Sequence, residues 1–239
     1  MNRLYIIDFI RCCAIIMMII FHIFLSFNLF SNKNYNLYDG ILKYLGLISR
    51  NLFIFISGIS LYLSFKNNKK KQFKKKQFNR LITILIFSII ITILTYIVLP
   101  EQYIISGILH YMFLSLSILI LFLNLFDVKY IYILFGLSLL FFNSDLYYYS
   151  NNDIIDYLLH ILGLDPYFKT SIDYFPLKKW LWKTILGFII AKNIDLKKIQ
   201  NLIPDWLDLD NNIIKNIGNK SLFIYMFHIP VLYFINKLI

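Results

Sequence analysis

The sequence predicts an all-α membrane protein, a polytopic transmembrane helical bundle of about seven spans with a cytoplasmic N-terminus. Three observations predict this class. The 239-residue chain is 59% hydrophobic and only 15% charged, and its mean hydropathy is +0.66, which no ordinary soluble domain matches. Apolar runs of about 17 to 25 residues, each sufficient to cross a bilayer, recur along the chain. A strongly basic stretch stands between two of these runs, where lysines set membrane topology.

We predict seven spans in one domain over residues 1–239. The spans are 3–27, 41–65, 81–99, 103–126, 130–142, 177–191 and 220–238. Gly58, flanked by serines in the second span, predicts a close approach to another helix. The charges in the first span and the lack of a small-residue cleavage site predict that this span is retained. We therefore expect a multi-pass protein of the cell membrane.

The predicted orientation rests on the segment 66–80, which we interpret as a loop. It carries eight Lys or Arg residues and no acid, so the positive-inside rule places it in the cytoplasm. Counting from this loop gives an inner N-terminus and an outer C-terminus. The segment 143–176 is then extracytoplasmic, and its length is typical of a functional loop or of one that holds a short helix. The polar segment 192–219 is cytoplasmic and has room for a surface helix.

Composition and motifs exclude several classes of protein. The net charge of +11 does not indicate nucleic-acid binding, because the basic residues gather beside hydrophobic spans, where they contact membrane lipid. Cys12 and Cys13 are adjacent, which excludes a disulfide framework and a metal-binding spacing. The sequence contains no Walker loop, dinucleotide fingerprint, HExxH or GxSxG motif, so those enzyme classes are unsupported.

The first span carries the ionisable residues Asp8, Arg11 and His22 inside it. Ionisable groups in hydrocarbon are costly, so they face a bundle interior, a cavity or a partner. The eleven residues from Arg11 to His22 bring the two to within about 20° of one helix face, about 16 Å apart along the axis. These residues predict a polar stripe that lines a channel or an active site.

On the predicted topology, Arg11 lies toward the cytoplasm and His22 toward the outside. A cation at the inner mouth suits an anionic donor such as a phosphate-bearing cofactor, and an imidazole at the outer mouth suits proton transfer from an amine or hydroxyl acceptor. Such a site passes an acyl group across the membrane. One alternative is that Asp8 and Arg11 simply neutralise each other, and another is that His22 is a hydrogen-bonded packing residue.

Other polar residues of the spans have two interpretations each. His110 and His228 are either hydrogen-bonding groups between helices or catalytic groups. Arg50, followed by Asn51, either extends its charge to the interface or binds an anionic or carbonyl oxygen in the cavity. We interpret His160 as a surface residue of the outer loop.

Five stretches, in order, resemble one known family. The opening RLYIIDFIRCCAIIMMIIFH is similar to the first helix of the bacterial and archaeal heparan-alpha-glucosaminide N-acetyltransferase-like family, and NLFIFISGISLYLS is similar to its second-helix signature. SGILHYMFLSL, DYFPLKKWLWKTILGF and IGNKSLFIYMFHIPVLY resemble three later elements. The spacing of Arg11 and His22 also resembles that of the broader acyltransferase-3 membrane proteins. The chain departs from the family at Cys12, where a glycine is usual.

The resemblance implies a transmembrane acyltransferase that moves acetyl from cytosolic acetyl-CoA to a sugar or related acceptor of the cell envelope. It implies catalytic roles for His22 and Asp8, with His110 in reserve, and donor binding by Arg11. We assign Arg50, Asn51 and His228 to substrate binding. The expected partners are acetyl-CoA, a glycan or amino-sugar acceptor and membrane lipid, with a homo-oligomer as an alternative to a monomer. We expect no metal and no nucleic acid.

Two rival functions are consistent with the same residues. A small-molecule or lipid transporter would use the polar stripe as its permeation path, although the inverted repeats and broken helices typical of transporters are not evident. A non-catalytic membrane scaffold would leave three membrane-embedded histidines and two arginines without a role. Binding of acetyl-CoA distinguishes an acyltransferase from both rivals.

Overall fold

The computed structural model describes residues 4–31, 33–148, 150, 152–165, 171–203 and 212–238. All regular elements among these residues are helices, which confirms the all-α class. In chain order the helices are α1 (Tyr5–Phe30), α2 (Gly40–Asn67), α3 (Lys70–Val98), α4 (Ile108–Leu125), α5 (Ile131–Asn143), α6 (Asp153–Leu162), α7 (Leu177–Asn193), α8 (Leu196–Asn201), α9 (Asn212–Asn219) and α10 (Ser221–Leu238). A 3₁₀ turn, Val128–Tyr130, precedes α5.

Four of the described helices, α1 to α4, are long and apolar enough to cross a membrane. The α5 region and α10 are apolar but shorter, and α7 is 17 residues long with several lysines. Helices of this composition fit a membrane protein. The count of seven spans and the cytoplasmic N-terminus remain predictions.

The basic segment 66–80 is mostly helical, so its interpretation as a loop is wrong. The turn between α2 and α3 is confined to the few residues before Lys70. Phe73 and Gln77, one helical turn apart, are both buried, and the Gln77 side-chain amide donates a hydrogen bond to Ser64 Oγ (2.7 Å). Burial of this face stabilises the helix. The many lysines around Phe73 and Gln77 make the apolar face difficult to recognise in the sequence.

The fourth span begins later than predicted, at Ile108 rather than Tyr103. The backbone before it is held by side chains instead of by helical hydrogen bonds. The Ile104 N–H donates to Thr95 Oγ1 (3.0 Å), and the Ile108 N–H donates to the carboxylate of Asp173 (3.0 Å). Asp173 therefore caps α4 from a distant part of the chain. The long segment 143–176 contains a short helix, α6, as its length suggested.

The chain forms two compact units. Unit 1 comprises Met1–Ile56 and Ile194–Ile239, and unit 2 comprises Ser57–Asn193. The boundary falls within α2 and directly after α7. That residues 1–239 act as one domain remains a prediction.

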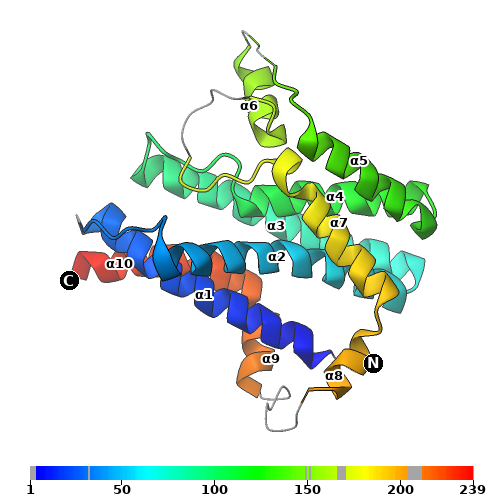
Figure 1. Ribbon diagram of the computed structural model, residues 1–239. Helices are drawn as coiled ribbons and strands as arrows, with labels where there is room; N and C mark the ends of the chain where they lie inside the picture. The colour runs from blue at the N-terminus through cyan, green and yellow to red at the C-terminus, as the bar shows by residue number, and fades with distance from the viewer. Residues whose placement is uncertain are drawn as a thin grey trace. The chain divides into compact units, whose positions relative to one another are not determined.

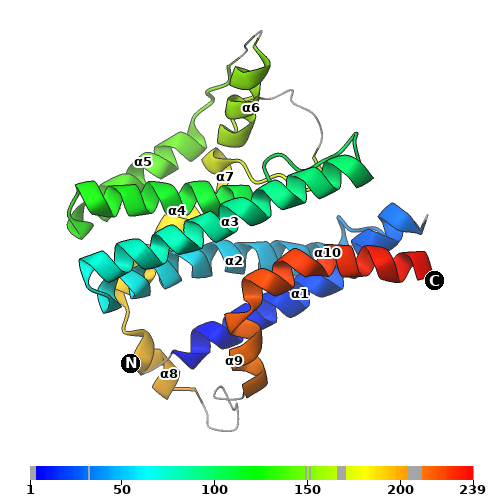
Figure 2. The ribbon, with the colours of Figure 1, turned by 180° about the vertical axis from the view of Figure 1, so that it is seen from behind.

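In unit 1 the first and last helices of the chain pack side by side, as Figures 1 and 2 show for α1 and α10. The Asn236 side-chain amide donates to Ser26 Oγ (3.0 Å), and its oxygen accepts from Ser31 Oγ (2.7 Å). Asn236 thus joins the end of α10 to the end of α1. The α9 helix packs against the beginning of α1.

In unit 2 the helix α7 packs against α4 and α5, and α3 runs along α4 (Figure 1). The most buried side chains of α7 include Ile185 and Phe188, both fully enclosed. Tyr111 of α4 is also buried, and its hydroxyl contacts Thr184 Oγ1 and the Trp180 carbonyl oxygen of α7. Through these contacts the segment 107–111 packs against the segment 178–184.

Gly58 lies against α7 so closely that no side chain fits there, which confirms the close approach predicted for it. A Cβ at this position would overlap the Thr184 carbonyl oxygen and come within 2.9 Å of the Phe188 nitrogen.

We predict that Gly58→Ala lowers the free energy of unfolding by about 1–3 kcal/mol, because backbone atoms must move. Thermal unfolding of the detergent-purified protein measures this loss.

The matched control is Gly136→Ala in α5, where an added Cβ meets nothing within 4 Å. This change should be neutral or slightly stabilising, because alanine favours helix over glycine. Equal unfolding temperatures for the two variants would contradict the assigned packing of α2 on α7.

Candidate active site

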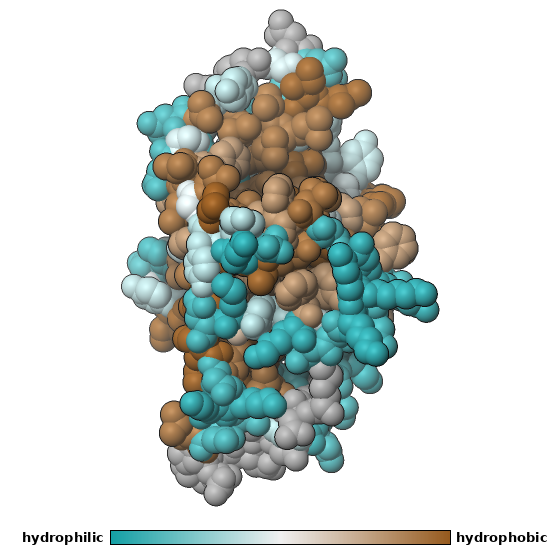
Figure 3. Space-filling view, turned by 90° about the vertical axis from the view of Figure 1, so that its right-hand side faces the viewer, coloured by the Kyte–Doolittle hydropathy of each residue, from teal (hydrophilic) through white to brown (hydrophobic). Residues whose placement is uncertain are grey.

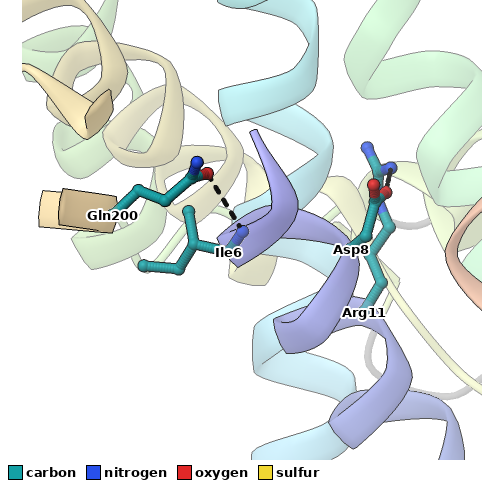
Figure 4. Close-up of polar contacts among 4 residues, drawn as sticks. All are labelled: Ile6, Asp8, Arg11 and Gln200. Carbon is teal, nitrogen blue, oxygen red and sulfur yellow. Dashed lines mark hydrogen bonds and ion pairs between the residues drawn. The ribbon is translucent and has the colours of Figure 1, made fainter. Parts of the chain in front are cut away.

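The polar stripe predicted on α1 begins with an ion pair. Arg11 Nη1 lies 3.2 Å from Asp8 Oδ1, three residues earlier on the helix. The Asp8 side chain is only 6% exposed, whereas that of Arg11 is 25% exposed. The proposed neutralisation is therefore real, and part of the Arg11 side chain stays accessible. Figure 4 shows the pair projecting together from the first turns of α1.

Asp8 is seated against the backbone of α9. A Cβ placed on Gly218 would come within 2.7 Å of Asp8 Oδ1 and 2.9 Å of its Cβ. The carboxylate thus occupies the space that any other residue at position 218 would fill. The start of α1 is also held by α8, because the Ile6 N–H donates to Gln200 Oε1 (3.5 Å, Figure 4).

At the other end of the stripe, His22 meets the last histidine of the chain. The His22 and His228 rings lie 4.7 Å apart, centre to centre, with planes at 85°. His22 Nδ1 lies 2.8 Å from the Met18 carbonyl oxygen, and His228 Nδ1 lies 2.6 Å from that of Tyr225. A carbonyl only accepts, so each Nδ1 carries a hydrogen and donates it.

The two backbone hydrogen bonds determine the tautomer of the pair. When each imidazole is neutral, its lone pair lies on Nε2. His228 is buried, and its Nε2 forms no hydrogen bond with a residue that the structure describes. The pair therefore presents two basic nitrogen atoms at the His22 end of the stripe. The contact between His228 and His22 was not predicted from the sequence.

One turn of α2 lies level with the middle of the stripe. Ser49 Oγ donates to the Ala14 carbonyl oxygen of α1 (2.9 Å), and both groups are buried. Ala14 is three residues beyond Arg11 and eight before His22, or about 4.5 and 12 Å along the helix axis. This hydrogen bond fixes the turn of α2 that carries Arg50 beside the stripe.

The residues predicted to bind substrate on α2 are half-buried. The Asn51 side-chain amide donates to the Leu47 carbonyl oxygen of its own helix (2.6 Å). Arg50 Nε is buried, so part of this guanidinium lies within the protein rather than at the surface. Both residues belong to unit 1 with the stripe.

His110 belongs to unit 2 and has a polar surrounding of its own. Its Nε2 lies 3.1 Å from Thr92 Oγ1, which is also 2.8 Å from the Ile104 carbonyl oxygen and 3.1 Å from that of Ser88. The single hydroxyl hydrogen goes to a carbonyl, so Nε2–H donates to Thr92. The lone pair of neutral His110 is therefore on Nδ1, which is buried and has no partner among the described residues.

His160 is buried, so its interpretation as a surface residue is wrong. Its ring stacks on Tyr174 at 4.3 Å, and Tyr174 donates a hydrogen bond to the His160 carbonyl oxygen (2.9 Å). Burial lowers the pKa of His160, and the nearby carboxylate of Asp165 partly opposes this shift. His160 is thus a packing group that joins α6 to the approach of α7.

Sequence reasoning missed four residues that organise these surroundings: Ser49, Thr92, Asp173 and Gly218. Asp173 and Gly218 lie in stretches that resemble family motifs. The resemblance marked these positions, but it did not indicate what the two residues do. Ser49 and Thr92 carried none, because a hydroxyl residue in an apolar helix most often bonds to its own helix.

The fold and these groups together define the class: an all-helical membrane protein that holds an ion pair and a histidine pair inside its apolar helices. The chain belongs to the family described as heparan-alpha-glucosaminide N-acetyltransferase, catalytic, whose model matches residues 3–230. No curated protein and no solved structure matches the chain. Family membership implies that the protein is an acetyltransferase.

We predict that Gly218→Ala displaces the Asp8 carboxylate and weakens its pairing with Arg11, because the added methyl group takes its place. Chemical shifts of selectively labelled aspartate and arginine side chains would report the change. Gly136→Ala, which adds a methyl group in open space, should leave those signals unchanged. An unaltered Asp8 signal in Gly218→Ala would contradict the assigned contact.

We also predict that Thr92→Val releases His110 from its tautomer, because valine keeps the shape of threonine but cannot accept the Nε2–H bond. Nitrogen chemical shifts of labelled histidine should show an Nε2-protonated His110 in the wild type and a mixture in Thr92→Val. Thr92→Ser should restore the wild-type signal. An Nδ1-protonated His110 in the wild type would refute the assignment.

Proposed function

We propose that this protein is a multi-pass transmembrane acyltransferase of the cell membrane, working as a single domain. In this proposal it moves an acetyl group from cytosolic acetyl-CoA to a sugar or related acceptor at the extracytoplasmic face. The observation that supports it most is that one continuous helix, α1, carries both the Asp8–Arg11 ion pair and His22, in a member of an acetyltransferase family. Arg11 and His22 are about 16 Å apart along the helix axis, and His22 meets His228 of α10.

The proposed donor site is at the Arg11 end of α1. The Arg11 guanidinium presents fixed donors suited to phosphate oxygens, and its part exposure leaves it able to meet a ligand. Asp8, buried against Gly218, holds the guanidinium in place. A cation anchored in this way keeps its orientation when no ligand is bound, which lowers the entropic cost of binding the donor.

The proposed chemistry is at the His22 end. The acceptor amine or hydroxyl attacks the thioester carbonyl carbon, so that a C–N or C–O bond forms. His22 Nε2 takes the proton from the attacking group. The C–S bond then breaks, and the CoA sulfur leaves and takes up a proton. The hydrogen bond from His22 Nδ1 to the Met18 carbonyl supports this role, because it keeps the basic nitrogen on the opposite side of the ring.

Four further residues receive roles in this proposal. His228 Nε2 and the polar groups of Arg50 and Asn51 bind the acceptor or the carbonyl oxygen of the acetyl group. His110, in unit 2, is the reserve candidate for the base. Its lone pair is on Nδ1 instead of Nε2, so the two histidines differ in the atom that would accept a proton.

We predict that Arg11→Ala weakens acetyl-CoA binding by about 10- to 100-fold, the range for losing a hydrogen bond to a charged group. Calorimetry on the detergent-purified protein measures this affinity. The matched control is Lys129→Ala, which removes the exposed cation of the Lys129–Asp127 ion pair (3.4 Å) and should leave binding unchanged. An equal loss in both variants would indicate a general charge effect instead of a donor site.

We predict that His22→Ala keeps donor binding but reduces acetyl transfer by about 100- to 10,000-fold, the usual contribution of a general base. Transfer of radiolabelled acetyl to amino-sugar acceptors measures the rate. Full activity in His22→Ala with loss in His110→Ala would move the base to His110. No binding of acetyl-CoA by the wild type would favour a transporter.

A further inference from the structure

The end of α2 and the start of α3 form a basic helical hairpin, defined here as residues 66–80. Its seven lysines are all exposed. They are Lys66, Lys69, Lys70, Lys71, Lys74, Lys75 and Lys76. None of them forms an ion pair with a residue that the structure describes. The hairpin is thus a surface of concentrated positive charge that the described part of the chain does not neutralise.

The basic hairpin is held in one shape by its buried side. Phe73 packs edge-on against Phe65 with ring centres 5.5 Å apart, and both Phe73 and Gln77 are buried. Gln77 and Asn68 both donate to Ser64 Oγ, at 2.7 and 3.4 Å. The lysines therefore project from a fixed helical frame and not from a flexible loop, so the surface is organised before any ligand binds.

This shape is electrostatically unfavourable without anions. Lys70 and Lys74, and likewise Lys71 and Lys75, are four residues apart on one helix, where like charges repel. The same lysines lie at the positive end of the helix dipole of α3. The chain therefore maintains, through its buried contacts, a charge arrangement that a bound anion would stabilise.

The continuation of α3 indicates which anion. After Arg80 the same helix becomes a candidate membrane span, and its side chains Ile82, Ile86 and Ile93 are well exposed. Ten residues separate Lys70 from Arg80, or about 15 Å of helix, so the lysines of α3 lie within this distance of the apolar stretch, next to where lipid headgroups would lie. Phe78, among the lysines, is 63% exposed, as expected of an aromatic side chain at a membrane interface.

We propose that the basic hairpin is a binding surface for anionic phospholipid headgroups. The lysines supply the charge, and the exposed apolar side chains beyond Arg80 accommodate the acyl chains. In Figure 1, α2 ends and α3 begins at the right-hand side, and on that face Figure 3 shows hydrophilic side chains beside a broad apolar surface. This inference is independent of the acyl transfer proposed above.

The test is lipid binding to the full-length protein in non-ionic detergent, with bound lipid counted by native mass spectrometry. Dioleoyl phosphatidylglycerol should bind more tightly than dioleoyl phosphatidylcholine, and its advantage should shrink as salt rises. The double variant Lys71→Gln/Lys75→Gln should weaken phosphatidylglycerol binding by about 30-fold, which corresponds to about 1 kcal/mol for each lysine near an anionic surface. Glutamine keeps the helix propensity of lysine.

The matched control is Lys33→Gln/Lys43→Gln, which removes the same charge from exposed lysines elsewhere in the chain. It should bind phosphatidylglycerol like the wild type. The proposal is overturned if both double variants lose the same affinity, or if the wild type does not prefer phosphatidylglycerol. Displacement of the lipid by equimolar inorganic phosphate would assign the surface to a soluble phosphate, and tighter binding of duplex DNA would assign it to nucleic acid.

Discussion

Polar groups inside an apolar helix must find partners within the protein, and the arrangement of unit 1 follows from that requirement. Asp8 is paired with Arg11, and the first histidine of the chain donates to the Met18 carbonyl. Ser26 accepts a hydrogen bond from Asn236. These polar groups of α1 are thus satisfied either one turn away on the same helix or by the helix packed beside it.

This requirement brings the two ends of the chain together. The α9 helix has to present a glycine to Asp8, and α10 has to present a histidine to His22. Gly218 and His228 follow each other along the chain in the same direction as their partners Asp8 and His22. The start of α1 therefore contacts α9 while its later turns contact α10, and the first and last sequence motifs form one structural unit.

The histidines illustrate how local hydrogen bonds direct chemistry. Those of unit 1 donate through Nδ1 to their own helices and keep Nε2 as the basic atom. The histidine of α4 instead donates through Nε2 to a threonine of the neighbouring helix and keeps Nδ1. Histidines in the two units would therefore accept a proton on different ring nitrogen atoms. The helical frame, not the residue type, selects which nitrogen atom can act.

The sequence by itself determined the all-α class, the apolar helices and the ion pair on α1, because these follow from composition and from a period of 3.6 residues. The helical state of the basic segment 66–80 was not predicted, because its two buried residues, Phe73 and Gln77, are outnumbered by lysines. Only the tertiary structure decided that Gly218 contacts Asp8, that His228 meets His22 and that Thr92 sets the tautomer of His110. Such pairings join residues far apart in the chain, and they depend on which helices pack together and at what height, which no local pattern encodes.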